Sequence, residues 1–411
     1  MVQKSESTTA ATTPGWALLL PFFLLVGMLF FSPNFRWQQD EDRETPYGAD
    51  YLQDWIGGSI VLSGDRQRLY DLEFVKELQH DPAKIGFTWP REKYFPMVYP
   101  PFHYVLVSPL SLLPYRWAML LWSFLSVMAF SATAWLLVRY QRTVAARFPL
   151  CFGAMIFFVP WIKCLSMGQK SALLLLLFTG TFLLLQRGRN FYAGLVFGLV
   201  AIKPQLGLVI GAVMLIKRQG SFACGAAATI GLLSGVSWLI QPTWWPDYAG
   251  LVSNMGDYLD TGGYQLSDSH SFWGGLKLLL PQLDSHWVNV LTLIISLLLF
   301  SLVLWTLRGK WEPGNHNFSR QFSMLVFATV LLSPHIYSYD LTILLLPIVL
   351  ILAQADFRSK TWLARGLLGL TVLLYLFSGG FPALANTIGF QPNLLVIGGL
   401  VILLTNREHE S

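Results

Sequence analysis

The sequence has little charge for its length. Only 12% of the 411 residues are Asp, Glu, Lys or Arg, whereas 54% are hydrophobic. A water-soluble domain carries about 25% charged residues to cover its surface. Because long apolar runs recur from end to end, the sequence excludes a soluble domain with one anchor and indicates an all-α polytopic membrane protein.

Cysteine is also scarce, and common nucleotide-binding and metalloprotease motifs are absent. Cys151, Cys164 and Cys224 all fall inside apolar runs without the spacing of metal ligands, so we interpret them as small hydrophobic residues. The sequence contains no P-loop, no dinucleotide-binding fingerprint and no HExxH motif. Its basic residues are scattered between apolar runs, so no nucleic-acid partner is expected and membrane lipids are the predicted surroundings.

The first apolar run, residues 16–31, lacks the features of a cleaved signal peptide. Lys4 is the only basic residue before it, and no small-x-small cleavage site follows it. We therefore predict an uncleaved first membrane helix over 15–32, preceded by a disordered Ser/Thr-rich tail over 1–14.

Apolar segments that could enter a membrane continue to the end of the chain. A membrane helix needs roughly 20 apolar residues, and fewer where it is broken or does not cross fully. We expect about 11–12 transmembrane helices within a single membrane-embedded domain over 15–404. The candidate segments are 15–32, 115–138, 148–165, 171–186, 191–202, 205–216, 221–240, 287–307, 320–333, 341–354, 362–379 and 391–404.

The basic residues of the short loops indicate an orientation. If the N-terminus is cytoplasmic, all of these loops and the C-terminal tail over 405–411 fall on the cytoplasmic side, as the positive-inside rule requires. The chain is then a multi-pass protein of the cell membrane, with the large polar loops 33–98 and 241–286 on the external face. The basic residues concerned are Arg139, Arg142, Arg147, Arg187, Arg189, Lys217, Arg218, Arg308, Lys310, Arg358, Lys360 and Arg365.

The first external loop is predicted to carry interfacial helices. Apolar residues spaced between Tyr51 and Ile60 predict a helix that lies on the membrane surface. Residues 99–113 are apolar but interrupted by prolines, and a full crossing there would move Arg139 to the external side. We therefore predict an interfacial or dipping helix in this second stretch.

Asp50 is the first candidate for catalysis. It stands at the start of the predicted surface helix, where a low-dielectric environment would raise the basicity of its carboxylate and suit a general base. The alternative is a helix N-cap, a position that Asp favours. Asp54, one helical turn later, is a weaker candidate for the same role.

Two further external turns carry residues suited to a phosphate. Lys203 stands between two short apolar segments, where a lysine is costly and usually functional. Its cation suits a lipid phosphate, and snorkelling to the interface is the alternative. Gln169 could hold a phosphate or a sugar hydroxyl, although a helix cap accounts for this motif equally well.

Other polar residues accompany them on the predicted external face. His335 and Asp340 stand at a break between two apolar segments, where a functional role competes with a structural His–Asp pair. Tyr339 lies in the same break. Tyr99 precedes two prolines and could line a site. His270, flanked by serines, could bind a sugar or belong to a solvated loop.

The order of these motifs resembles the polyprenol-phosphate-mannose-dependent glycosyltransferases of family 87, which have the C-type membrane glycosyltransferase fold. The likeness spans most of residues 47–350. It departs at 269–271, where Ser-His-Ser stands in place of the Asn-Gln-Ser that members often carry. The residues that carry the resemblance are Asp50, Leu69, Tyr70, Asp71, Tyr99, Pro100, Pro101, Phe102, Pro109, Leu110, Leu113, Pro114, Gly168, Gln169, Lys203, Pro204, Gln205, Ser333, Pro334, His335, Tyr339 and Asp340.

The resemblance implies a reaction and a role for each candidate. A hexose, with mannose as the first choice, would pass from a polyprenyl-phosphate donor to a lipid or glycan acceptor with inversion at the anomeric carbon. Asp50 would be the catalytic base. The donor phosphate would be bound by Lys203, His335 and Gln169. The substrate-lining residues would be Tyr99, His270, Tyr339 and Asp340. No metal or other cofactor is expected, because a lipid phosphate is already a good leaving group.

Two other classes of protein compete with the enzyme. A transporter or a lipid or polysaccharide flippase also has many helices, broken segments and buried charges. It would place its polar groups near mid-membrane and show repeat-related halves, and neither pattern is present in the sequence. A scaffold or polymer-export subunit without chemistry is the third alternative, and Asp50 and its neighbours argue against it through the resemblance.

Overall fold

The structure is a computed structural model that describes residues 27, 46, 48–253, 265–315, 317–379 and 382–406. Within these ranges the regular elements are α-helices and 3-10 helices, and the β-type contact is an isolated bridge between Ser269 and Tyr337. The predicted all-α class is therefore confirmed. The predicted first membrane helix, except for residue 27, and the predicted N-terminal tail lie outside the described residues.

Helices of very different length follow one another along the described ranges. The α-helices are α2 (Tyr51–Ser63), α3 (Leu72–Gln79), α4 (Pro82–Ile85), α5 (Pro101–Val107), α6 (Tyr115–Tyr140), α7 (Arg142–Ala146), α8 (Phe148–Ile156), α9 (Val159–Ser166), α10 (Ser171–Gln186), α11 (Asn190–Gly198), α12 (Leu208–Ile216), α13 (Gly220–Ile240), α14 (Trp244–Ser253), α16 (Phe272–Leu279), α17 (Ser285–Thr306), α18 (Phe318–Leu332), α19 (Leu345–Gln354), α20 (Trp362–Phe377), α21 (Pro382–Ile388) and α22 (Pro392–Thr405). The 3-10 helices are η3 (Arg66–Arg68), η4 (Ser108–Leu112), η5 (Leu199–Ile202), η6 (Pro204–Leu206), η7 (Leu266–Asp268) and η8 (Ser338–Leu344).

The helices differ in their capacity to cross a membrane. Among the described residues, three helices are long and apolar enough to cross a membrane alone: α6, α13 and α17. Helices α8 and α9 together are a fourth candidate, bent by 44° at their junction. The other predicted segments in the described ranges are also helical but shorter. The predicted number of about 11–12 transmembrane helices therefore includes helices that are too short to cross a membrane on their own.

The shorter helices are broken where polar residues must be placed inside the bundle. The segments predicted over 191–202 and 205–216 form two half-length units, α11 with η5 and η6 with α12. They meet at Lys203, whose backbone leaves the helical region at φ −125° and ψ 80°. Such a break is tolerated at membrane depth because surrounding protein, rather than lipid, contacts the freed backbone groups.

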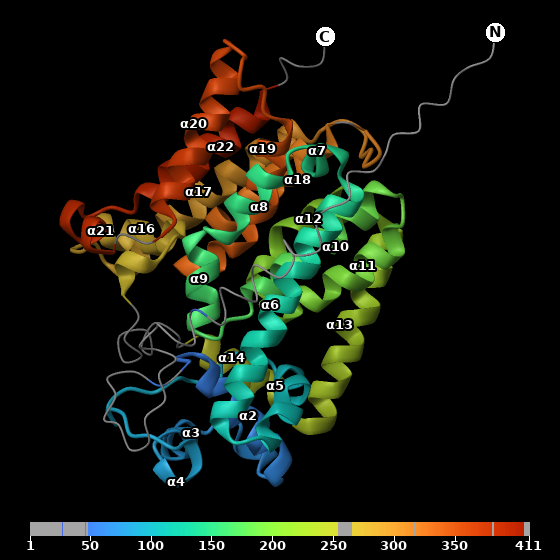
Figure 1. Cartoon of the computed structure of the whole chain (residues 1–411). Helices are drawn as coiled ribbons and strands as arrows, with labels where there is room; N and C mark the ends of the chain where they lie inside the picture. Colours follow the sequence, from blue (N-terminus) through green and yellow to red (C-terminus); the bar gives the residue numbers. More distant parts are fainter. Residues whose placement is uncertain are drawn as a thin grey trace.

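The basic loops gather at one end of the bundle. The Arg187 guanidinium lies 3.8 Å from the ring centroid of Tyr140, the last residue of α6. Arg147 donates a hydrogen bond to the Leu352 carbonyl oxygen near the end of α19 at 2.9 Å. Helix α7 lies at this end, near α18 and α19, whereas α2, α3, α4 and α5 lie at the opposite end (Figure 1). The tertiary structure thus separates the basic loops from the predicted external loop.

Helix α2 differs from the predicted surface helix. The helix is confirmed, but ten of its 13 residues are buried, including the polar Gln53 and Asp54. Close packing is the reason: a Cβ atom on Gly57 would lie only 2.1 Å from the Tyr104 ring of α5. Glycine therefore lets α5 and η4 cover the face that the sequence pattern assigns to water.

The stretch 99–113, predicted as an interfacial or dipping helix, forms two short helices, α5 and η4, each much shorter than the roughly 20 residues of a membrane crossing. Hydrogen bonds connect this stretch to α2 and to α13. The Trp55 indole of α2 donates to the Leu113 carbonyl oxygen at 3.1 Å. The backbone N–H of Phe102 donates to the Ser237 hydroxyl near the end of α13 at 3.1 Å. These bonds attach α2 and α5 to the helical bundle and position the turn before α2.

Candidate active site

Asp50 occupies a tight turn immediately before α2. Its side chain is only 3% exposed, and the preceding Ala49 has a positive φ of 41°, which costs a residue with a Cβ atom conformational energy. Asp50 stands at the N-cap position, yet its side chain makes no capping hydrogen bond. The capping alternative therefore does not account for this carboxylate.

Gln169 connects Asp50 to Lys203. The Gln169 side-chain amide Nε2 donates a hydrogen bond to the Oδ2 of Asp50, and its Oε1 accepts one from the Lys203 ammonium at 3.3 Å. This is the amide orientation that the charges require, because the NH₂ faces a carboxylate and the oxygen faces a cation. Gly168 lets the two turns approach: it has a φ of +61°, and a Cβ atom there would lie 2.5 Å from that of Tyr51.

Lys203 is held by Asp340 on its other side. The Lys203 ammonium donates to the Asp340 Oδ1 at 2.6 Å, and the Ser171 hydroxyl at the start of α10 donates to the same oxygen at 2.9 Å. The Asp340 Oδ2 accepts from the Tyr337 backbone N–H at 3.4 Å. The structural alternative, a His335–Asp340 pair, gives way to a Lys–Asp pair, because Asp340 is bonded to Lys203.

A second buried ion pair lies beside the first, and sequence reasoning did not predict it. The Lys170 ammonium lies 2.7 Å from the Asp54 Oδ2, and the His103 Nε2 lies 2.9 Å from the Asp54 Oδ1. The Lys170 ammonium also lies 3.9 Å from the ring centroid of Tyr99. The signal for Lys170 was present in the sequence, since the residue directly follows Gln169 in an apolar context.

The surrounding charges give Asp50 and Asp54 different basicities. Burial raises the pKa of Asp50, and the Gln169 hydrogen bond and the charges of Lys170 and Lys203 offset this only in part. Burial acts in the same direction on Asp54, but Lys170 and His103 outweigh it, so the pKa of Asp54 falls below its ordinary value. Asp50 is therefore the more basic of the two and the better proton acceptor.

A cavity of about 520 Å³ adjoins this cluster. Its lining combines polar and apolar side chains, and two of the apolar ones are exposed, Leu208 by 62% and Val252 by 45%. The lining includes Gln169 and Lys203 but not Asp50, which is bonded to the lining residue Gln169. The lining residues are Gln53, Pro96, Val98, Tyr99, Gln169, Ile202, Lys203, Pro204, Gln205, Leu208, Tyr248, Val252, Trp273, Asn289, Pro334, His335, Tyr339 and Asp340.

The remaining predicted site residues divide between this cavity and another location. Tyr99, Tyr339 and Asp340 line the cavity, as does His335, whose pKa burial lowers to about 4. His270 does not line it. The His270 Nδ1 lies 3.3 Å from the Asn393 Nδ2 of α22, and burial lowers the pKa of this histidine to about 3. Tertiary packing therefore directs His270 toward α22 rather than toward the cavity.

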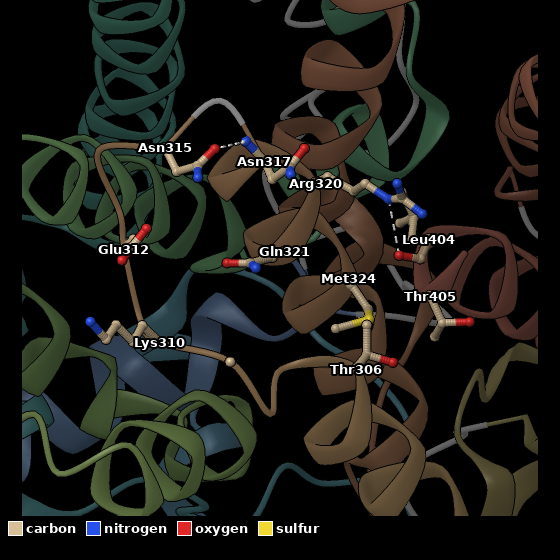
Figure 2. A pocket seen from close by; sticks show the side chains of 11 residues that line it. Thr306, Lys310, Glu312, Asn315, Asn317, Arg320, Gln321, Met324, Leu404 and Thr405 are labelled. Atoms are coloured by element: carbon tan, nitrogen blue, oxygen red, sulfur yellow. Dashed lines mark hydrogen bonds between the residues drawn. The ribbon is translucent and has the colours of Figure 1, made fainter. Parts of the chain in front are cut away.

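Two other cavities lie near the basic loops and contain none of the predicted site residues. One, of about 170 Å³, is lined in part by Thr306, Lys310 and Arg320, whose guanidinium bonds to the carbonyl oxygen of Leu404 at 3.0 Å (Figure 2). The other, of about 700 Å³, adjoins α7 and α20. Within the described ranges, no group of three or more His, Cys, Asp and Glu side chains is placed to hold a metal ion.

The fold and the buried polar cluster define a polytopic membrane protein with a cavity suited to a polar ligand. The sequence profile of glycosyltransferase family 87 matches residues 97–334. The match covers more than half of the chain, so the chain belongs to this family and is a membrane glycosyltransferase. The matched segment contains Tyr99, Gln169 and Lys203, whereas Asp50 and His335 lie outside it. A comparison with curated proteins finds no match.

Proposed function

We propose that this glycosyltransferase moves a hexose, with mannose as the first candidate, from a polyprenyl-phosphate donor to a lipid or glycan acceptor by inverting single displacement. One observation carries the proposal. A continuous hydrogen-bonded chain joins Asp50, Gln169 and Lys203 beside a single cavity. It links a carboxylate that can take a proton to an ammonium that can stabilise a departing phosphate, and this reaction needs both groups.

Asp50 is the base in this scheme. The acceptor oxygen attacks the anomeric carbon while its proton passes to the Asp50 carboxylate. The bond between the anomeric carbon and the phosphate oxygen breaks, and its electron pair leaves with the polyprenyl phosphate. Since Gln169 lines the cavity and Asp50 does not, the scheme requires the Gln169 side chain to turn aside when the acceptor enters.

Lys203 receives the departing phosphate. An ammonium group has three N–H donors, and in this structure two of them meet Gln169 and Asp340. The third remains for a phosphate oxygen. Asp340 thus orients Lys203 in addition to lining the cavity. His335 is neutral near pH 7 because of its lowered pKa, so it contributes an N–H donor rather than a positive charge.

The shape of the cavity suits a lipid-linked donor. Its polar lining, with Lys203, Gln169 and the Tyr99 ring, accommodates the sugar and the phosphate. Its apolar lining includes the exposed side chains of Leu208 and Val252, where a polyprenyl chain could continue into the surrounding lipid. A soluble nucleotide sugar has no group for this apolar lining.

We place the site at the external face of the cell membrane, with both termini in the cytoplasm. Two features support this. Arg147 and Arg187 contact helix ends in the part of the bundle that carries α7, opposite α2 (Figure 1), and cytoplasmic loops are the ones enriched in Lys and Arg. The partners of the protein are then the lipid-linked donor, the acceptor and the surrounding lipids.

The proposal is tested with the purified full chain in lipid vesicles. The two donors are polyprenyl-phosphate mannose and a nucleotide-linked mannose, both labelled, with a panel of alkyl hexoside acceptors. We expect transfer from the lipid donor alone, with inverted anomeric configuration in the product. Added EDTA should leave the rate unchanged, because the scheme contains no metal. Transfer from the nucleotide sugar alone, or retention of configuration, would contradict the proposal.

A further inference from the structure

Gln53 is a cavity residue that neither the proposed base nor the phosphate site uses. It lies on α2, three residues after Asp50, and its side chain lines the cavity with Tyr99 and Gln169. Only 2% of Gln53 is exposed. Its Oε1 is buried and has no hydrogen-bond partner among the described residues.

Two other buried glutamines, Gln169 and Gln79, pair both ends of their side-chain amides. Gln169 uses both ends of its amide, toward Asp50 and Lys203. Gln79 also uses both, since its Nε2 donates to the Phe95 carbonyl oxygen at 2.7 Å and its Oε1 accepts from the Phe95 N–H at 2.9 Å. Buried polar atoms are nearly always paired, because an unpaired acceptor loses its hydrogen bonds to water without replacement.

We propose that Gln53 is a specificity-determining residue whose side-chain oxygen accepts a hydrogen bond from a sugar hydroxyl bound in the cavity. The inference rests on the proposed function and goes beyond it, since it assigns the recognition of a hydroxyl that does not react. The donor hexose and the acceptor could each supply that hydroxyl. In either case the bound sugar satisfies an oxygen that the protein leaves unpaired.

This arrangement gives selectivity as well as affinity. A sugar that lacks the matching hydroxyl would leave the Gln53 oxygen buried and unpaired, so the site would reject it. The position of Gln53 one helical turn from Asp50 links this recognition to the orientation of the acceptor and donor around the base. We expect wild-type kcat/KM to fall by about tenfold to a hundredfold for the one deoxy sugar that lacks this hydroxyl.

The test combines a variant with a series of substrates. Gln53→Met keeps an unbranched side chain of similar length without the carbonyl oxygen, and Gln53→Leu removes the same oxygen in case the first variant does not fold. Each is assayed with polyprenyl-phosphate mannose and its monodeoxy forms, and with octyl mannoside and its monodeoxy forms. Ser59→Ala is the matched control on the same helix, because the Ser59 hydroxyl bonds to the Ile56 carbonyl oxygen of that helix at 2.8 Å.

The expected result is a loss of discrimination at one hydroxyl. Gln53→Met should use the parent sugar and one deoxy form equally well and should treat the other deoxy forms as the wild type does. Gln53→Leu should lose the same preference, whereas Ser59→Ala should keep it. The donor and acceptor series show which sugar carries the hydroxyl. Unchanged discrimination throughout in Gln53→Met would overturn this role, whereas absence of transfer by the wild type with every lipid donor would overturn the proposed function itself.

Discussion

The side-chain amide of Gln169 donates a hydrogen bond to the carboxylate of Asp50, although the two residues are 119 positions apart in the sequence. The same amide accepts from Lys203. Gln169 therefore stands between the proposed base and the proposed phosphate ligand, and its side chain lines the cavity beside both. The properties of Asp50 depend on this contact, which leads to the first two predictions.

Asp50→Asn should lower kcat by roughly 10²–10⁴-fold, the usual contribution of general base catalysis. The variant keeps the shape of the side chain and can still accept a hydrogen bond from Gln169, so expression and thermal stability should stay near wild type. Asp81→Asn is the control in the same loop, because the exposed Asp81 caps α4 and Asn caps equally well. Wild-type turnover in Asp50→Asn would remove Asp50 from the mechanism.

Gln169→Leu should move the acid limb of the pH–rate profile to higher pH. Burial raises the pKa of Asp50, and the Gln169 hydrogen bond lowers it in part. Without that bond the pKa rises further, so the base becomes protonated at a higher pH and activity is lost earlier as the pH falls. The measurement is kcat/KM against pH. A profile identical to that of the wild type would show that Gln169 does not tune Asp50, and Gln141→Leu at the other end of the bundle is the control.

Lys203→Ala should weaken the use and binding of a polyprenyl-phosphate sugar, whereas Lys203→Arg should keep part of the activity because it keeps the charge. The structure adds a complication, since Lys203→Ala leaves the buried Asp340 without its cation. The double variant Lys203→Ala with Asp340→Asn removes both charges and separates folding from function. Donor binding is measured on vesicles. Equal binding by the wild type and by the stable variants would argue against a phosphate role for Lys203.

Asp54→Asn should destabilise the protein by roughly 3–5 kcal/mol, because it leaves the Lys170 ammonium buried without its counter-ion. Asp54 is therefore unsuitable as a silent control for Asp50. Replacing both partners, Asp54→Asn with Lys170→Gln, should restore part of the loss. Thermal unfolding in detergent gives the comparison, and an Asp54→Asn variant as stable as the wild type would contradict the buried pair.

The ion pair between Asp54 and Lys170 should also make the stability of the protein depend on pH. The pKa of Asp54 is lowered in the folded protein by Lys170 and His103, despite its burial. The ion pair therefore stabilises the fold above the ordinary carboxyl pKa, and this contribution is lost as the pH falls through the lowered value. Unfolding midpoints of wild type and of the double variant should converge at acid pH, and a constant difference would count against the pair.

Single cysteines should report opposite sides of the membrane. Glu77→Cys in the first loop should react with an impermeant thiol reagent added from outside, and Thr143→Cys on α7 should not. Both positions are exposed, whereas the buried Gln79 is a poor site for labelling. Cys224, which is exposed on α13, is first replaced by Ser so that only the introduced cysteine can be labelled. External labelling at 143 and none at 77 would reverse the proposed orientation and place the site on the cytoplasmic face.

Much of the fold could be predicted from local patterns. The helices near α6, α10, α13 and α17 follow from apolar runs, and the short helices over 99–113 follow from prolines in an apolar stretch. The burial of α2 could not be predicted in this way. Its polar residues Gln53 and Asp54 look like a water-facing side until α5 and η4 cover them, and that covering depends on glycine contacts between distant segments.

The candidate site also combines features that local patterns predict with features that depend on contacts between distant segments. The class of the protein and the residue types of the site follow from local sequence patterns, because apolar length, helix breaks and the cost of a lysine between membrane segments are local properties. Tertiary contacts determine which of Asp50 and Asp54 is the more basic. Asp54 meets Lys170 and His103, whereas Asp50 meets the neutral amide of Gln169. These partners come from other segments of the chain, and a pKa depends on the charges and solvent around a group rather than on its neighbours in sequence.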